Sequence, residues 1–535
     1  MTNPKYMPTF SASFRFLIAT ILALGLFFRF ANLDQKIYWY DEAFTSLRIS
    51  GYTEKDVAQQ VFNGHEIRVR DLQKFQHLNP KKGLIDTVNG LALEEPQITP
   101  LYFVILRLWT ELFGSSVALT RSLSAVISLL TLPCIYWLCQ ELFESPLVGW
   151  MSVVLVAVSP YHVLFAQDAR MYSLWTVTTL LSSASLLRAM RIKTRTGWAI
   201  YTVTLVLGLY THLLTLLTAI GHGIYVLFAR GFRFNKTVIR YLLASLTGLL
   251  LFLPWALILL KGISQAERMT SANGGRQPIL SIVTSWAFQP SRIFFDLNVT
   301  RNSSYLSIMF MSFAAIALLA LIVYSVYYLY IKSPKCTFFF IFTLITILPL
   351  ILTLKGLIKG GVGSTTMRYL IPSYLGVQIA VAHLLTRKIS DRNISILGRK
   401  FWQLVPTTLL LCGIISCGVS YQALYWWNKG AVENFDTAQI INQSIQPLIV
   451  SSGVFQTNGS IVGNILSLSH VLDPKARLRL AIEPEIPSIP NDSRDVFLYK
   501  PSDSILRRVE QEYEIEPIKH GDDVWLWRIK QHKTH

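Results

Sequence analysis

Ionisable side chains recur at the ends of long apolar segments in this chain. Asp41 and Glu42 follow the first apolar segment, and Asp168 and Arg170 follow the third. Other polar or aromatic residues at segment ends are Arg121, Tyr172, His212, Arg368 and Tyr369. Carboxylates can act as general bases or metal ligands, and arginines can hold a phosphate through two parallel hydrogen bonds. Taken singly, each residue also fits a plainer role, because arginines and aromatic side chains commonly anchor helix ends at a membrane surface.

The composition indicates an integral membrane protein. The chain has 535 residues, of which 52% are hydrophobic and only 15% are charged, whereas soluble chains carry about 25% charged residues. A helix needs roughly 20 apolar residues to cross a bilayer, and about eleven segments approach that length. They lie near residues 14–30, 121–140, 147–166, 171–189, 198–210, 212–229, 240–260, 305–331, 336–354, 369–386 and 403–423. The five cysteines all fall inside apolar runs, so neither a disulfide framework nor a Cys-based zinc site is expected.

Residues 101–114 decide the direction of every later span. This segment is apolar but short, and it contains Arg107 and Glu111, so it predicts an interfacial helix. With the N-terminus inside, the basic clusters then fall in cytoplasmic loops, and Asp391 is the one acid among them. These loops are 190–197, 230–239, 332–335 and 387–402. Because Lys and Arg concentrate in cytoplasmic loops, the net charge of +18 is mostly an orientation signal and does not indicate nucleic-acid binding.

This topology predicts two domains. The first is a transmembrane domain over residues 1–423, in which 31–120 form the first extracytoplasmic loop with its interfacial helix and 261–304 form a second large loop. The second is the tail, 424–535, which predicts a small extracytoplasmic α/β domain of a size that can fold by itself. Within the first loop, residues 65–82 are rich in charge. They predict an exposed polar helix in preference to a metal site made of His65, Glu66 and His77.

The same topology places the polar segment ends near one leaflet. Acids for proton transfer or metal binding would then lie beside arginines that can hold a phosphate, which fits chemistry on a lipid-linked phosphate. No P-loop or dinucleotide fingerprint occurs, and the glycines at 360–363 lack the strand–turn–helix context of such a motif. An outward-facing site without a nucleotide motif argues against cytosolic ATP or a nucleotide sugar as the donor.

Several motifs resemble those of the GT-C superfamily of membrane glycosyltransferases. The pattern begins with Asp41-Glu42 after the first span and ends with Arg368-Tyr369-Leu370-Ile371-Pro372. Between them lie Pro100-Leu101-Tyr102-Phe103, Leu112-Phe113-Gly114, Arg121-Ser122, Ser159-Pro160 and the run from Gln167 to Tyr172. The order and spacing resemble the protein O-mannosyltransferase and aminoarabinose lipid A transferase group (glycosyltransferase family 39-like), here of bacterial type. The resemblance covers roughly residues 10–390.

The resemblance implies a GT-C-like fold of about eleven spans and an inverting sugar transfer from a polyprenyl-phosphate donor. The acceptor would be a lipid, a glycan or a protein, and the site would face the periplasm or exterior of a multi-pass inner (plasma) membrane protein. It implies that Asp41 is catalytic, with Glu42 beside it. Arg170 and Arg368 are expected to bind the donor phosphate, with Arg121 a weaker candidate. Asp168, Tyr172, His212 and Tyr369 complete the expected substrate site. No cofactor is certain, and a divalent metal ion stays open because such enzymes differ in metal dependence.

Two other functions remain as alternatives. A transporter or flippase of polyprenyl-linked glycans would move substrate without covalent transfer, and it would commonly show matched hydrophobic halves and interrupted helices near the midplane. The ionisable residues gather at one face instead of lining a path, which disfavours this alternative. A non-enzymatic assembly scaffold acting through the tail is the second, and activity that persisted after deletion of residues 424–535 would leave that role open.

Overall fold

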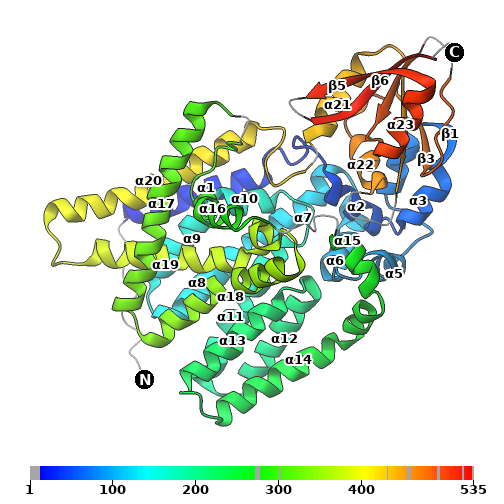
Figure 1. The fold of residues 1–535 in the computed structure, drawn as a ribbon. Coiled ribbons are helices and arrows are strands. Elements are labelled where there is room, and N and C mark those ends of the chain that lie inside the picture. Colours follow the sequence, from blue (N-terminus) through cyan, green and yellow to red (C-terminus); the bar gives the residue numbers. More distant parts are fainter. Residues whose placement is uncertain are drawn as a thin grey trace.

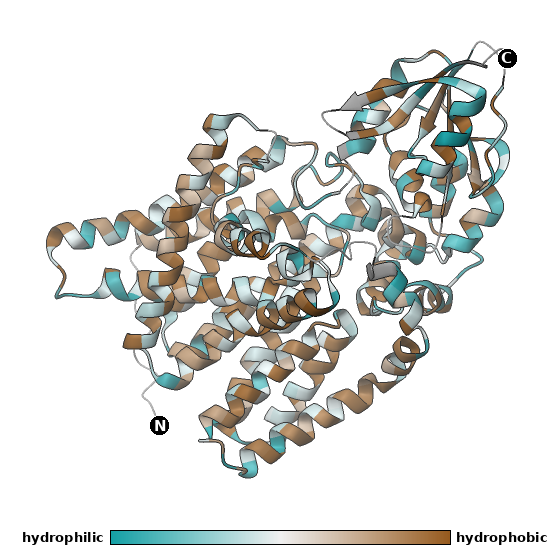
Figure 2. Ribbon diagram, in the orientation of Figure 1, coloured by the Kyte–Doolittle hydropathy of each residue, from teal (hydrophilic) through white to brown (hydrophobic). Residues whose placement is uncertain are grey.

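A helical bundle makes up most of the molecule, and a β-sheet with its own helices lies at one end of it (Figure 1). The computed structural model describes residues 12–271, 277–300, 303–430, 432–454, 460–490, 494–520 and 523–532. Hydrophobic residues run along the bundle helices (Figure 2), and many of them are exposed, for example along α17 and α20. Exposed apolar surface on this scale is typical of helices that face lipid.

Most of the described residues up to 422 lie in helices. The helices are α1 (Ala12–Phe30), α2 (Tyr40–Ile49), α3 (Glu54–Val61), α4 (Val69–Gln73), α5 (Leu84–Glu94), α6 (Leu101–Phe113), α7 (Val117–Leu129), α8 (Thr131–Phe143), α9 (Pro146–Ala157), α10 (Pro160–Ala166), α11 (Tyr172–Ile192), α12 (Arg195–Thr211), α13 (Thr215–Ala229), α14 (Lys236–Lys261), α15 (Ile263–Ser271), α16 (Ile279–Phe288), α17 (Tyr305–Lys332), α18 (Lys335–Lys359), α19 (Ile371–Ser390) and α20 (Ile396–Gln422). Short 3₁₀ helices are η1 (Lys74–Gln76), η2 (Gln289–Ile293), η3 (Gly363–Thr365) and η4 (Met367–Tyr369).

All eleven predicted spans are helical, but fewer stand out as spans by length and composition. Among the described residues, six helices qualify, and the bent pair α9–α10 would make a seventh. The six are α1, the joined α7–α8 (Val117–Phe143), α14, α17, α18 and α20. The inner helices differ because they face protein: α11 buries a series of Ser and Thr side chains, and α19 buries Gln378 and His383. Helix α6, the predicted interfacial helix, has only 13 residues and is not among the candidate spans.

The third predicted span is broken into two helices. Helices α9 and α10 meet at an angle of 61°. Pro160 has no N–H to bond the carbonyl one turn earlier, so the helical ladder is interrupted there. Arg29 of α1 donates hydrogen bonds to the carbonyl oxygens of Val156 and Ala157 at this break. The bend directs α10 into the short turn that carries Asp168 and Arg170.

The sheet has six strands in the order β1-β3-β2-β4-β6-β5. Five strands come from the tail: β2 (Pro447–Gly453), β3 (Arg477–Ile482), β4 (Asp495–Tyr499), β5 (Tyr513–His520) and β6 (Asp523–His532). The central β3, β2 and β4 run parallel, and the other pairs are antiparallel. The tail helices are α21 (Val432–Gln443), α22 (Ile461–Leu468) and α23 (Asp503–Glu512). This confirms the small strand-containing region expected at the C-terminus.

The first loop supplies the remaining edge strand, which the sequence did not predict. Strand β1 (Asn63–Arg68) pairs antiparallel with β3. The exposed polar helix expected over residues 65–82 is therefore wrong at 65–68, which belong to β1, whereas α4 and η1 of the same segment are helical. Glu66 on the strand binds Arg479 and Arg494 of the tail. The sheet thus extends beyond the predicted boundary of 424–535.

Helix α2 is held between the bundle and the tail. Phe44 and Leu47 of α2 share one hydrophobic core with Ile461 and Ile465 of α22. A Cβ at Gly463 would collide with the rings of Tyr40 and Phe44, so glycine permits this close approach of α22 to α2. The position of α2, which carries Asp41 and Glu42, therefore depends on the tail as well as on the bundle.

Candidate active site

Asp41 lies between two arginines that are distant from it in sequence. It stands in the first turn of α2, and its Oδ2 is 3.2 Å from Nη1 of Arg368 and 3.9 Å from Nη2 of Arg170. Arg170 also donates to the Asp41 backbone oxygen and to Oγ1 of Thr45, at 3.3 and 3.2 Å. We call these three side chains the Asp41 group. One carboxylate against two guanidiniums leaves a local net charge of +1.

The Asp41 group is partly open to solvent. The side chain of Asp41 is 20% exposed and that of Arg368 is 28% exposed, whereas Arg170 is only 7% exposed. The Nε atoms of both arginines are buried and have no hydrogen-bond partner. Buried donors are usually paired, so these two groups retain capacity for an anion. The arrangement can bind a phosphate and present a carboxylate beside it.

Aromatic rings surround the Asp41 group. The Arg368 guanidinium lies 5.5 Å from the ring centroids of both Trp39 and Tyr369, which is cation–π distance. His212, whose ring centroid is 6.1 Å from that of Tyr369, stacks on Trp175 at 4.1 Å. Nδ1 of His212 accepts the Leu214 N–H at 3.2 Å, so a neutral ring carries its proton on Nε2. These rings restrict the rotamers of Arg368 and give one side of the site an apolar wall.

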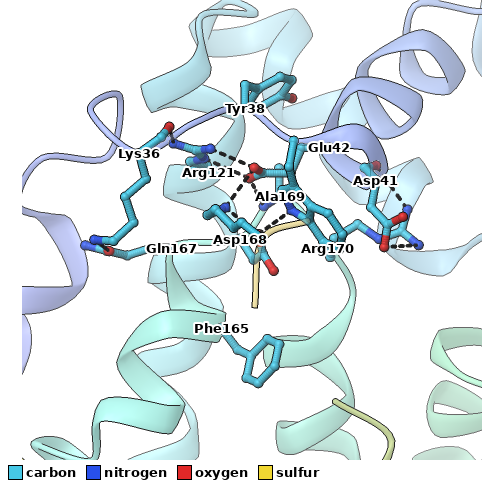
Figure 3. Close-up of polar contacts among 12 residues, drawn as sticks. Lys36, Tyr38, Asp41, Glu42, Arg121, Phe165, Gln167, Asp168, Ala169 and Arg170 are labelled. Carbon is cyan, nitrogen blue, oxygen red and sulfur yellow. Dashed lines mark hydrogen bonds and ion pairs between the residues drawn. The ribbon is translucent and has the colours of Figure 1, made fainter. Parts of the chain in front are cut away.

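Glu42 faces the opposite way, into a buried ion network (Figure 3). Its Oε1 and Oε2 accept hydrogen bonds from Nε and Nη2 of Arg121 at 2.7 and 2.6 Å. Nζ of Lys429 lies 2.8 Å from Oε2 of Glu42 and 2.6 Å from Oδ1 of Asp168. We call Glu42, Arg121, Asp168 and Lys429 the buried network. All four side chains are essentially without solvent contact, and their formal charges cancel.

The buried network joins three parts of the backbone. Glu42 Oε1 accepts the N–H of Ala169 at 2.9 Å, and Asp168 Oδ1 accepts the indole N–H of Trp39 at 3.1 Å. Arg121 donates to three carbonyl oxygens of the 33–37 segment, those of Leu33, Lys36 and Ile37. At the edge of the network Lys36 donates to Gln167, and burial together with Lys429 and Arg121 lowers the pKa of Lys36 to about 7.

The two acids of the network are shifted in opposite directions. Burial alone would raise the pKa of Glu42, but Arg121 and Lys429 outweigh it and hold that pKa well below its ordinary value. Burial, together with the nearby Glu42, raises the pKa of Asp168 in spite of Lys429. Glu42 is therefore firmly ionised, which suits a structural ion pair and not a proton acceptor at neutral pH.

The lowered pKa of Glu42 predicts a loss of stability in acid. Because its pKa is lower folded than unfolded, its contribution is complete at neutral pH and is lost as the pH falls from about 4.5 towards the folded-state value. The raised pKa of Asp168 acts with the opposite sign and reduces the net slope. We expect the thermal unfolding midpoint of the purified protein to fall between pH 6 and pH 3, and to fall less steeply in Glu42→Gln. Equal slopes in the two proteins would contradict this assignment.

The structure brings the predicted site residues together but divides them into two sets. Asp41, Arg170 and Arg368 form the open group, with Tyr369 and His212 beside them, and Tyr172 is buried against Phe165 at 5.1 Å. Glu42, Arg121 and Asp168 lie outside the open group, and each is ion-paired with a buried partner. Their catalytic and substrate-binding roles stay predictions, and their burial favours a structural role.

Sequence reasoning missed Lys429 and the role of Trp39. Lys429 follows the last span, in the run Trp426-Trp427-Asn428-Lys429, and a lysine on the predicted outer side departs from the cytoplasmic bias. That position was the available signal. Trp39 follows the first span, where an aromatic residue is typical of the membrane surface, but its side chain is buried and donates to Asp168.

The described residues contain no group of three or more His, Cys, Asp or Glu side chains placed to hold a metal ion. The neighbours of Asp41 are arginines, whose charge would oppose a divalent cation there. His65, Glu66 and His77 do not converge either, because Glu66 pairs with arginines and His77 bonds Ser115.

A groove of about 520 Å³ lies elsewhere, between α16, η2 and the start of α17. It contains Arg292 and Asp296, and the latter accepts the indole N–H groups of Trp426 and Trp427. The groove shares no lining residue with the Asp41 group. We therefore place the candidate site at the Asp41 group on the basis of its charges, and not at this groove.

Comparison with known proteins supports the resemblance in the sequence. Residues 95–258 match the family described as dolichyl-phosphate-mannose-protein mannosyltransferase. No curated protein matches the sequence.

Solved structures of two kinds share the fold. ArnT from Cupriavidus metallidurans, in its complex with undecaprenyl phosphate, is 10% identical with a TM-score of 0.53, covering 97% of this chain and 98% of that one. Its apo form is 12% identical with a TM-score of 0.51 over the same shares of both chains. The apo oligosaccharyltransferase of Archaeoglobus fulgidus is 11% identical with a TM-score of 0.52, covering 95% of this chain and 70% of that one. The family match over residues 95–258 and the shared fold both agree with the resemblance to the GT-C superfamily of membrane glycosyltransferases.

Proposed function

We propose that this protein is an inverting glycosyltransferase that moves a sugar from a polyprenyl-phosphate donor to an acceptor on the outer face of the membrane. The observation that carries the proposal is the Asp41 group, in which a partly exposed carboxylate lies between two arginines with unpartnered Nε atoms. The undecaprenyl phosphate bound to the structurally similar ArnT supports a lipid phosphate as the ligand. The acceptor is a lipid, a glycan or a protein.

In this proposal the two arginines hold the leaving group. Transfer breaks the bond between the sugar and the phosphate oxygen, so negative charge grows on the lipid phosphate. Arg368 and Arg170 stabilise that charge, and the aromatic wall keeps Arg368 in place. A phosphate that binds both arginines would also free Asp41 from its present ion pairs.

Asp41 acts on the acceptor in the same proposal. An inverting displacement needs the acceptor oxygen aligned on the face of the sugar opposite to the leaving group. Asp41 accepts the hydrogen bond, and finally the proton, of an acceptor hydroxyl as that oxygen attacks the sugar. An acceptor that is itself a phosphate needs no proton removed, and Asp41 would then only position it.

The proposal also covers orientation and location. The parity of the spans and the basic cytoplasmic loops favour a site that faces the periplasm or exterior of a bacterial inner membrane. The outer position of the Asp41 group follows from the same parity, because its three residues belong to spans that end on one side.

A transfer assay with purified protein in lipid vesicles tests the function. Polyprenyl-phosphate sugars are supplied with extracted envelope lipids, glycans and proteins, and mass spectrometry follows release of polyprenyl phosphate and the mass gained by an acceptor. We expect one polyprenyl phosphate to be released for each sugar that an acceptor gains. Movement of the lipid-linked sugar across the bilayer without covalent transfer would instead identify a flippase and overturn the proposal.

Arg368→Ala is expected to weaken donor binding. A charge-assisted hydrogen bond is worth roughly 1.5–3 kcal/mol, so the KM for the donor should rise by about ten- to a hundredfold. Arg368→Lys should recover only part of this, because lysine lacks the planar fork of arginine. Donor titrations at saturating acceptor measure the effect, with the exposed Arg399→Ala as control. An unchanged donor KM would remove Arg368 from the phosphate site.

A further inference from the structure

Lys429 is the one member of the buried network that comes from the segment after the last span. It contacts both acids, Glu42 at 2.8 Å and Asp168 at 2.6 Å, and its side chain is fully buried. The two acids lie on the two segments that carry the open site, α2 and the turn at 167–171, which we call its two walls. Glu42 is next to Asp41 on α2, and Asp168 precedes Arg170 by two residues in the turn between α10 and α11.

We propose that Lys429 is a positioning residue that fixes the distance between Asp41 and Arg170, so that the C-terminal segment is an integral part of the active site. The inference rests on the proposed function for its catalytic consequence. Lys429 does not touch the open site. It acts by tying the turn at 167–171 to the first turn of α2, from which the reacting carboxylate and the phosphate-binding arginine project in the other direction.

The local geometry explains why this tie matters. The Arg170 guanidinium reaches Asp41 Oδ2 only at 3.9 Å, and it otherwise bonds the backbone oxygen of Asp41 and Thr45. A small displacement of the turn would therefore change the spacing of the two groups directly. The other links between the walls are the Glu42 bond to the Ala169 N–H and the Trp39 bond to Asp168. Lys429 also adds a positive charge between the two buried carboxylates.

The network also needs Lys429 for charge balance, and the test must separate that need from positioning. Without Lys429, two buried carboxylates would face Arg121 alone. Lys429→Met removes the charge and retains most of the side-chain volume. Lys429→Met combined with Asp168→Asn restores a neutral network, so it should accumulate as folded protein even where the single variant does not.

The first measurement is kcat divided by the number of donor-binding sites. That number is obtained from the binding of polyprenyl phosphate to the purified protein. We expect kcat per site to fall at least tenfold in Lys429→Met and in the double variant. The donor KM should rise by a smaller factor, because Arg170 is displaced while Arg368, on a separate element, still binds the phosphate. Lys429→Arg should recover part of the loss. Wild-type kcat per site in the double variant would overturn the proposal, since it would show that Lys429 only balances charge.

The second readout does not depend on activity. Amide hydrogen exchange of residues 40–49 and 167–171 should accelerate at least tenfold in the double variant relative to wild type. The matched control is Lys500→Met, which breaks a half-exposed ion pair with Glu433 in the same tail and should leave both segments unchanged. Unaltered exchange in the double variant would also overturn the proposal. If wild-type protein transfers no sugar, the proposed function fails, and exchange still decides whether Lys429 holds the two walls together.

Discussion

Replacing Asp41 by Asn is expected to lower sugar transfer by at least about a hundredfold, the usual contribution of a general acid–base group. Asn keeps the size of the side chain but cannot take a proton from the acceptor. The side chain is partly exposed and contributes no buried charge pair comparable to that of Glu42, so the folded protein should accumulate normally. Transfer rates and thermal unfolding midpoints of protein purified in parallel measure both expectations.

Two further variants sharpen the Asp41 experiment. Asp34→Asn changes an exposed acid in the same loop and should leave transfer at the wild-type rate. Asp41→Glu keeps the carboxylate but moves it by one methylene group, so it should retain more activity than Asp41→Asn. Full activity in Asp41→Asn would show that the reacting carboxylate lies elsewhere or that the acceptor needs no proton removed. An acceptor that carries its own phosphate is the chemical test of the second outcome.

Arg121→Met is expected to be the most destabilising single change in the site region. Arg121 makes both hydrogen bonds to Glu42 and three to the carbonyl oxygens of the 33–37 segment, all without access to water. Removing one partner of a buried ion pair typically costs about 3–5 kcal/mol, a large part of the 5–15 kcal/mol that stabilises an ordinary domain. We expect a sharply lower unfolding midpoint and little protein in the membrane.

The arrangement of charges supplies the control for Arg121. Combining Arg121→Met with Glu42→Gln restores neutrality, leaves Lys429 paired with Asp168, and should recover part of the lost stability. Arg399→Met, at an exposed position, should change the midpoint little. If Arg121→Met unfolded at the wild-type temperature, the buried network would not hold the first loop on the bundle.

The sequence alone was sufficient for the helical architecture, and it predicts the side of the membrane on which the site lies. Apolar segments of membrane-spanning length lead to helices because no other single-segment structure satisfies its own backbone in lipid. Basic loops then orient those helices. These two rules predict that Asp41, Arg170 and Arg368 lie at one leaflet. In the structure, the Asp41 carboxylate lies 3.2 Å from Arg368 and 3.9 Å from Arg170.

Only the tertiary structure decided which of the polar residues face an open site. Asp41 and Glu42 are neighbours, yet consecutive residues of a helix point about 100° apart, so one faces the arginines and the other the buried network. The sequence gives no measure of which direction is outward when α2 is covered on one side by the bundle and on another by the tail. The contact between Glu42 and Lys429 spans 387 positions, and β1 joins a sheet whose other strands begin at Pro447. Such long-range contacts depend on how whole elements pack, which neither hydropathy nor local motifs encode.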